Sequence, residues 1–112
     1  MPKMTRNLLG ATALAATFAV PSLAVATDLE VIHWWTSKGE SAAVSEFAAG
    51  FEAQGDKWID SAVALGETAR ATVMQRALGG DPPAAAQFNP GRQYEELIAA
   101  GLLLDLTDVA TE

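Results

Sequence analysis

The stretch EVIHWWTSKGE, Glu30 to Glu40, passes from a strand-like pattern into a loop and decides the fold. Successive residues of a strand point to opposite faces. In a strand over residues 29–35, both faces are largely apolar, with Leu29, Val31, His33 and Trp35 on one and Ile32 and Trp34 on the other. A strand that is apolar on both faces is typical of a parallel sheet covered on both sides.

Downstream of this strand, helical and strand-like patterns alternate with short connections. Apolar residues at positions 44, 47, 48 and 51 have the spacing of an amphipathic helix that begins at Gly39 or Ser41. The further predicted elements are a strand over residues 58–65, a helix over 67–78, a strand over 84–88 and a helix over about 94–101. The order β-α-β-α-β-α predicts an α/β fold with a parallel sheet.

Two polar segments are predicted to meet at one edge of this sheet. In open parallel sheets, ligands bind outside the carboxyl ends of the strands. The segment WWTSKGE, residues 34–40, follows the first strand, and QFNPGR, residues 87–92, follows the third. We therefore expect these two segments to converge in space although they lie far apart in the sequence.

The first 26 residues have the pattern of a secretory signal peptide. A basic start precedes an apolar run over residues 8–20 and a small-residue cleavage site that ends at Ala26. The run is shorter than the ~20 apolar residues that a membrane span needs. Because the chain has no cysteine for a lipid anchor, residues 27–112 are predicted to be a periplasmic protein that is not embedded in the membrane.

Composition argues against several classes of function. The chain carries 7 basic and 14 acidic residues, and its net charge is −7. Nucleic-acid binding depends on Lys and Arg that neutralise phosphates, so no nucleic-acid partner is expected. One histidine without cysteine argues against a zinc site. Neither a P-loop nor a G-x-G-x-x-G nucleotide motif is present, so no metal and no cofactor are expected.

The two converging segments carry side chains that suit a sugar. Sugars present flat C–H faces, which stack on tryptophan, and hydroxyls, which bond to charged and amide side chains. The candidate contacts are Trp34, Trp35, Lys38 and Glu40 after the first strand, and Gln87, Asn89 and Arg92 after the third. The residues alone leave open whether either tryptophan touches a ligand or only fills a core. His33 is predicted to be a satisfied, partly buried strand residue.

Two long segments carry a family resemblance. They are EVIHWWTSKGESAAVSEFAAGFEAQG, residues 30–55, and LGGDPPAAAQFNPGRQYEELIAAGLLLDLTDVA, residues 78–110. In order and spacing they resemble the amino-terminal part of family-1 extracellular solute-binding proteins, the periplasmic sugar receptors of ABC importers, and most of all the glucose/mannose type. The resemblance implies a type II periplasmic binding protein-like fold with two lobes around a hinge. Residues 27–112 would form an incomplete amino-terminal lobe.

The resemblance also implies a function without bond chemistry. The protein would bind a monosaccharide or short oligosaccharide, with a glucose-like hexose first, and deliver it to the permease subunits of the importer. Carried over from glucose-type members, the sugar contacts are Trp34, Trp35, Glu40, Gln87 and Asn89, with Lys38 and Arg92 as weaker additions. Asn89 stands where glucose receptors have a lysine, which puts strict glucose specificity in doubt.

Two other readings remain open at this stage. A secreted carbohydrate-active hydrolase could use Glu40 as its acid, although it would need a second carboxylate at a fixed separation. A small exported domain could carry its tryptophans only as core. Because half a cleft cannot surround a ligand and an incomplete sheet exposes apolar surface, the sequence predicts that this chain alone binds sugar weakly or not at all.

Overall fold

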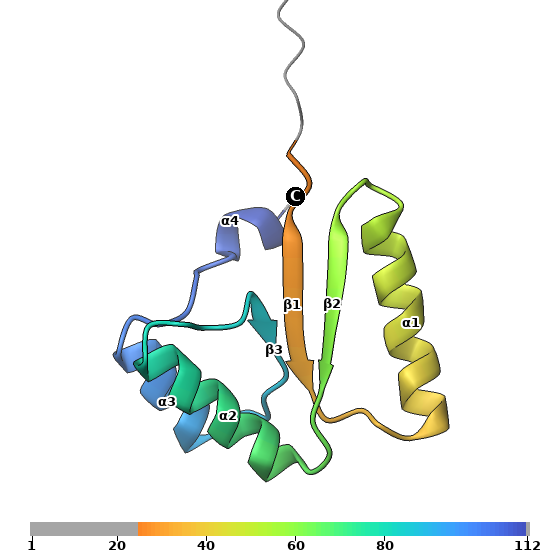
Figure 1. The fold of residues 1–112 in the computed structure, drawn as a ribbon. Helices are drawn as coiled ribbons and strands as arrows, with labels where there is room; N and C mark the ends of the chain where they lie inside the picture. Colours follow the sequence, from red (N-terminus) through yellow and green to blue (C-terminus); the bar gives the residue numbers. More distant parts are fainter. Residues whose placement is uncertain (1–24, 112) are drawn as a thin grey trace, which may run out of the picture.

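The computed structural model describes residues 25–111 as an α/β fold around a three-stranded parallel sheet (Figure 1). The predicted signal peptide lies outside the described residues, except for its last two positions. In chain order the elements are β1 (Asp28–His33), α1 (Lys38–Glu52), β2 (Lys57–Ala62), α2 (Gly66–Leu78), β3 (Ala85–Ala86), α3 (Arg92–Ala99) and α4 (Thr107–Ala110). The predicted alternation of strands and helices is confirmed, and the short α4 was not predicted.

The strand order is β2-β1-β3, so β1 is the central strand. It pairs in parallel with β2 along its whole length and with β3 through Val31↔Ala85 and Ile32↔Ala86. From the end of β1 the chain turns toward α1, which lies along β2, and from the end of β3 it turns toward α3 on the other side (Figure 1). The carboxyl ends of β1 and β3 therefore form a topological switch point, the place where such sheets bind ligands.

The helices cover opposite faces of the sheet. On one face, α2 packs onto β1 in a small core of Ile32, Ala69 and Val73, against which Trp34, Val63 and Phe88 are packed. On the other face, α1 buries Val44 and lies over the side of β1 that carries Val31 and His33. The sheet is thus covered from both sides, as the doubly apolar strand predicts, although Phe47 of α1 keeps 61% of its surface exposed.

Strand β1 ends at His33, two residues earlier than predicted. The reason is the bonding of the next two amides: Trp34 N–H donates to a side chain of the loop after β3, and Trp35 N–H donates to the ring of His33. Neither amide is available to continue the ladder. Strand β3 is also shorter than predicted, although the Gln87 N–H still donates to the Ile32 carbonyl at 2.9 Å.

Helix α1 begins at Lys38, one residue before the earlier of its two predicted starts, because Ser37 caps it. The Ser37 hydroxyl accepts from the Glu40 N–H at 3.4 Å, and Glu40 Oε2 accepts from the Ser37 N–H at 3.0 Å. This reciprocal capping box satisfies two amides that a helix start would otherwise leave without partners. The capping box therefore fixes where the loop after β1 ends.

An ion pair ties β1 to α2 on the α2 side of the sheet, the closed face. Arg76 donates through Nη1 and Nη2 to the two carboxylate oxygens of Glu30, at 2.7 and 2.8 Å, and Ser61 Oγ donates to the same carboxylate at 3.0 Å. The bonds from Arg76, more than any other contact, hold the pKa of Glu30 below its usual range. A bidentate pair of this kind fixes orientation as well as distance, so it sets how α2 lies on the sheet.

Within residues 25–111, no helix has both the length and the apolar character needed to cross a membrane.

Candidate functional site

The predicted convergence of the two segments is confirmed for three residues. Trp34 and Trp35 leave the carboxyl end of β1, and Gln87 directly follows β3 at the same edge. The Trp34 N–H donates to Gln87 Oε1 at 3.1 Å, across 53 positions of sequence. Trp35 and Gln87 also line the same hollow. The structure therefore places both tryptophans and one of the predicted amides at the switch point of the sheet.

The two indoles lie on opposite faces of the sheet, as the strand alternation predicts, even though the strand has already ended. Trp35 shares the α1 side with Val31 and His33, whereas Trp34 packs against the Ile32 core on the α2 side. Both side chains are half-buried. Each tryptophan thus combines a packing role with a part that stays accessible.

The first turns of helix α2 hold the Trp34 ring. The Arg70 guanidinium carbon lies 5.5 Å from the Trp34 ring centroid, a cation–π distance. A Cβ atom at Gly66 would come within 3.3 Å of Trp34 Cδ2, so the helix approaches the indole closely. Arg70 is itself oriented by a 3.1 Å hydrogen bond from its Nε to Gln93 Oε1.

Neither Gly66 nor Arg70 was predicted from the sequence as a residue of the site. The signal that could have found them is helical spacing, because both share the face of α2 that carries the buried Ala69 and Val73. A helix that follows a parallel strand begins at the carboxyl edge of the sheet. Its first turns are therefore close to any site at that edge.

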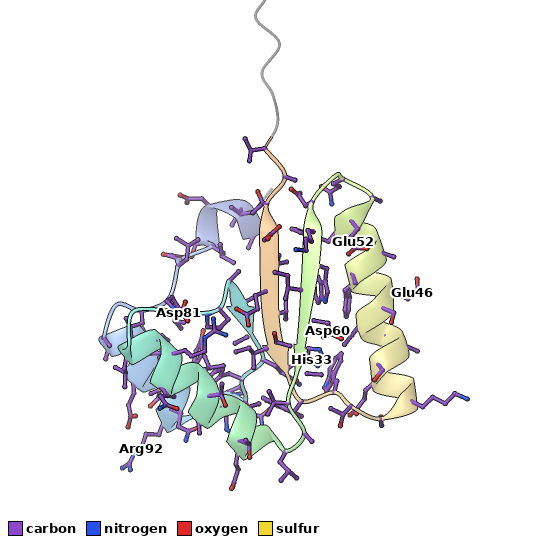
Figure 2. The ribbon with its side chains drawn as sticks, viewed as in Figure 1. His33, Glu46, Glu52, Asp60, Asp81 and Arg92 are labelled. Atoms are coloured by element: carbon purple, nitrogen blue, oxygen red, sulfur yellow. The ribbon has the colours of Figure 1, made fainter. Side chains whose placement is uncertain are left out.

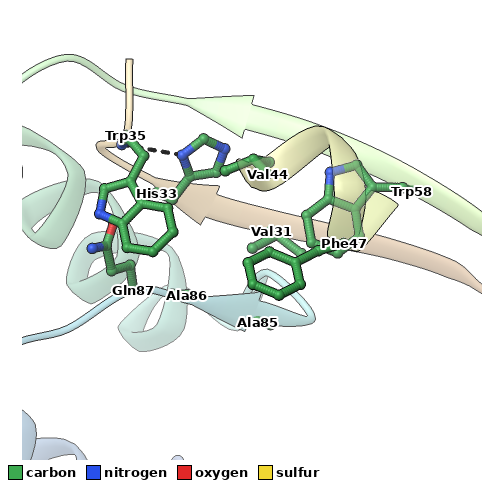
Figure 3. A pocket seen from close by; sticks show the side chains of 9 residues that line it. All are labelled: Val31, His33, Trp35, Val44, Phe47, Trp58, Ala85, Ala86 and Gln87. Carbon is green, nitrogen blue, oxygen red and sulfur yellow. Dashed lines mark hydrogen bonds between the residues drawn. The ribbon is translucent and has the colours of Figure 1, made fainter. Parts of the chain in front are cut away.

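Trp35 lines a hollow of about 220 Å³ beneath α1 (Figure 3). Its walls are nearly all apolar and come from Val31, His33, Trp35, Val44, Phe47, Trp58, Ala85, Ala86 and Gln87. His33 is a strand residue with satisfied ring nitrogens, as predicted, but it is more deeply buried than predicted, with 5% of its surface exposed. Its Nε2 contacts the Asp60 carboxylate on β2, and its Nδ1 accepts the Trp35 N–H at 3.2 Å. The bond to Trp35 is drawn in Figure 3.

Lys38 and Glu40 lie in the exposed first turn of α1. Hydrogen bonds from the Ser37 side chain, then from its backbone, hold the pKa of Glu40 below its usual range. The carboxylate already caps the helix, so a ligand would share it with Ser37. A general acid needs a raised pKa to be protonated near neutral pH, and the environment of Glu40 acts in the opposite direction. This observation disfavours the hydrolase reading.

Asn89 and Arg92 line a different hollow, of about 310 Å³, together with Arg70, Pro90, Gly91 and Gln93. Both residues are exposed, and Figure 2 shows Arg92 on the outer side of the helices, far from His33. Arg70 connects this hollow to Trp34, because it lines the hollow and covers the indole. The structure thus groups the seven predicted residues into a central set at the strand ends and two peripheral sets.

Among the described residues, no group of three or more His, Asp or Glu side chains could hold a metal ion.

Comparison with known proteins shows which ones this sequence is similar to. No protein-family model matches the chain. It is 36% identical over 110 residues to a protein of Mesorhizobium japonicum named "Probable sugar-binding periplasmic protein", an alignment that covers 96% of this chain and 26% of that relative. A Rhizobium meliloti protein of the same name is 36% identical over 111 residues, covering 97% of this chain and 26% of the relative.

A Brucella suis protein, again of that name, is 34% identical over 87 residues, or 76% of this chain and 20% of the relative. The chain spans about a quarter of the length of the first two curated relatives. The resemblance inferred from the two long segments is confirmed: nearly the whole chain is similar to a part of proteins named as periplasmic sugar-binding proteins.

Proposed function

We propose that this chain forms one wall of a sugar-binding site in a periplasmic solute-binding protein of the type II fold. That protein would pass its sugar to the permease subunits of an ABC importer and would carry out no reaction itself. The observation that carries the proposal is the meeting of Trp34, Trp35 and Gln87 at the switch point of the sheet. The names of the relatives support sugar as the ligand class.

In this proposal the central set makes the first contacts. The accessible part of an indole stacks on the C–H face of a hexose, which is the usual way in which aromatic side chains bind sugars. Because Gln87 Oε1 already accepts from Trp34, the NH₂ group of that amide is the part that donates to a sugar hydroxyl. Gln87 therefore has two tasks: it joins the ends of β1 and β3, and it offers a donor.

The peripheral residues then extend the site. Lys38 and Glu40 approach from the start of α1, and Asn89 and Arg92 from the start of α3. The ligand is a monosaccharide or short oligosaccharide, with a glucose-like hexose first. Because Asn89 offers an amide where glucose-type receptors have a lysine, we expect mannose and short glucans to compete with glucose rather than be rejected.

The experiment must detect weak binding, because one wall contacts only part of a ligand's surface. Saturation-transfer NMR on the full chain, with glucose, mannose and maltose as probes, meets this need. The sequence leaves weak binding or none open for this chain alone, and the meeting of Trp34, Trp35 and Gln87 favours weak binding. We therefore expect transfer to at least one of these sugars and its loss in Trp35→Leu and Gln87→Leu. Glu52→Gln is the control, since Glu52 lies at the opposite end of the sheet (Figure 2).

Two results would contradict the proposal. One is the absence of transfer to all three sugars in a chain that is folded. The other is equal transfer in the wild type, Trp35→Leu and Gln87→Leu, which would place binding elsewhere. The spectra also test the hydrolase alternative, because cleavage of maltose would appear as a new glucose signal.

A further inference from the structure

The buried contacts of His33 define one protonation form of its ring. Its Nε2 contacts Asp60, and a carboxylate can only accept, so Nε2 carries the proton. Its Nδ1 faces the Trp35 N–H at 3.2 Å, and an amide can only donate, so Nδ1 is bare. The two partners together select the neutral Nε2–H tautomer.

The loop after β1 is held by two side-chain acceptors. His33 accepts the Trp35 amide, and Gln87 accepts the Trp34 amide at 3.1 Å. Both tryptophans follow the last ladder residue of β1, so their position depends on these acceptors rather than on strand pairing. Asp60 acts one step further away, because it fixes which nitrogen of the ring is the acceptor.

We propose that His33 is a positioning residue of the Trp35 wall, and that Asp60 sets its tautomer. The neutral ring holds the Trp35 backbone at the carboxyl end of β1. Protonation of Nδ1 replaces the acceptor with a second donor, so the bond to Trp35 is lost and Gln87 remains as the acceptor that holds the loop. The contact of Trp35 with sugar rests on the proposed function. The relay, by which we mean the contacts of the His33 ring with Asp60 and with the Trp35 amide, does not.

Asp60 is the charged group that faces the ring of His33. Among the described residues, the other walls of the hollow are uncharged: Val31 and Trp35 from β1 and its loop, Val44 and Phe47 from α1, Trp58 from β2, and Ala85, Ala86 and Gln87 from β3 and its loop. Asp60 is the charged side chain in contact with the ring, and it is itself 53% exposed.

Nitrogen-15 NMR tests the relay directly, because His33 is the single histidine of the chain. In the full chain near pH 8, we expect the two ring shifts to report the Nε2–H tautomer. Acidification should move Nδ1 and the Trp35 amide signal along one titration curve. Asp60→Asn should shift the tautomer ratio toward Nδ1–H. A ring that is already Nδ1–H in the wild type would overturn the proposal.

A matched pair of variants separates positioning from packing. Asn and Leu have similar shapes, but only Asn offers an acceptor near the place of Nδ1. We expect the Trp35 amide to exchange with solvent about tenfold faster in His33→Leu than in His33→Asn, which corresponds to one lost hydrogen bond. Equal exchange in two folded variants would show that the ring only fills space. Sugar titration of the pair is a separate readout: if the relay holds but neither the pair nor the wild type binds sugar, the proposed function fails and the relay stands.

Discussion

On the α2 side of the sheet, Ile32 is 2% exposed beneath Ala69 and Val73, whereas on the α1 side Phe47 keeps 61% of its surface exposed beside a hollow. The central strand supplies both faces with apolar side chains, so the difference comes from the helices. Ala69 and Gly66 are small and let α2 approach closely, and Arg76 fastens it to Glu30. Helix α1 lies along β2 and leaves the face above β3 open.

This comparison explains why two adjacent tryptophans have different surroundings. Trp34 is held by Gly66 and Arg70 on the closed side, whereas Trp35 borders the open hollow and depends on one hydrogen bond from its amide. The closed side is thus more tightly packed than the open side. Substitutions on the two sides test this division.

Ile32→Ala should destabilise the chain most. It removes a buried side chain, 2% exposed, from the closed core, and such deletions cost about 2–5 kcal/mol. Val31→Ala, at the neighbouring position on the open face, should cost less. Val is one methylene smaller than Ile, which alone accounts for ~0.8 kcal/mol, and we expect the two costs to differ by more than that. Urea unfolding measures both free energies. Equal costs would show that the two faces are packed equally well.

Glu30→Gln tests the bond that fastens α2. The folded-state pKa of Glu30 is lowered from 4.5, chiefly by Arg76. A carboxylate with a depressed pKa contributes stability above its unfolded pKa and loses it as the pH falls through the folded value. At pH 7 the variant should therefore melt a few degrees lower than the wild type (roughly 2–5 °C).

The difference between Glu30→Gln and the wild type should shrink as the pH falls below 4.5, the ordinary value from which the pKa of Glu30 is lowered. Glu46→Gln removes the same charge from an exposed position on α1 and serves as the control. Thermal unfolding at several pH values provides the data. A pH profile of Glu30→Gln that runs parallel to the wild type would mean that the ion pair does not stabilise the closed face.

Gly66→Ala and Gly50→Ala should change the free energy of unfolding by slightly different amounts. Nothing lies within 4 Å of a Cβ atom at Gly50 in α1, so alanine there should stabilise the helix by about 0.5–1 kcal/mol. At Gly66 the new methyl group would meet Trp34 at 3.3 Å and Arg70 at 3.0 Å. We expect a smaller gain or a loss, together with a shift of the Trp34 indole signal. An equal gain at both positions would mean that Trp34 is not held tightly.

Much of this arrangement could be predicted from the sequence because it depends on period and topology. The two-residue alternation in β1 places Trp34 and Trp35 on opposite faces even beyond the strand end, and the alternating elements bring Gln87 to the same edge. The ends of the strands could not be predicted. They depend on side-chain acceptors, such as the ring of His33, that compete with the ladder for backbone amides.

The roles of individual polar residues were harder to predict than their positions. Glu40 was predicted as a sugar contact, and its carboxylate also caps helix α1, because Ser37 and Glu40 form an S-x-x-E capping box. Arg70 was missed because its role depends on how close α2 lies to Trp34, which is set by the missing side chain of Gly66. Helical spacing places Arg70 on the face of α2 that carries the buried Ala69 and Val73, but the distance between this face and Trp34 leaves no periodic trace in the sequence.

The most direct test of the sugar wall is a titration of the three indole N–H signals in the full chain with glucose and mannose. Trp34 and Trp35 lie at the carboxyl end of β1, whereas Trp58 pairs with Leu29 near the amino end of the sheet, in the wall of the hollow that Trp35 also lines. We predict that one or both of the first two signals shift with sugar by more than the Trp58 signal does. Three unmoved signals, or three that move equally, would contradict a sugar-binding wall at this edge.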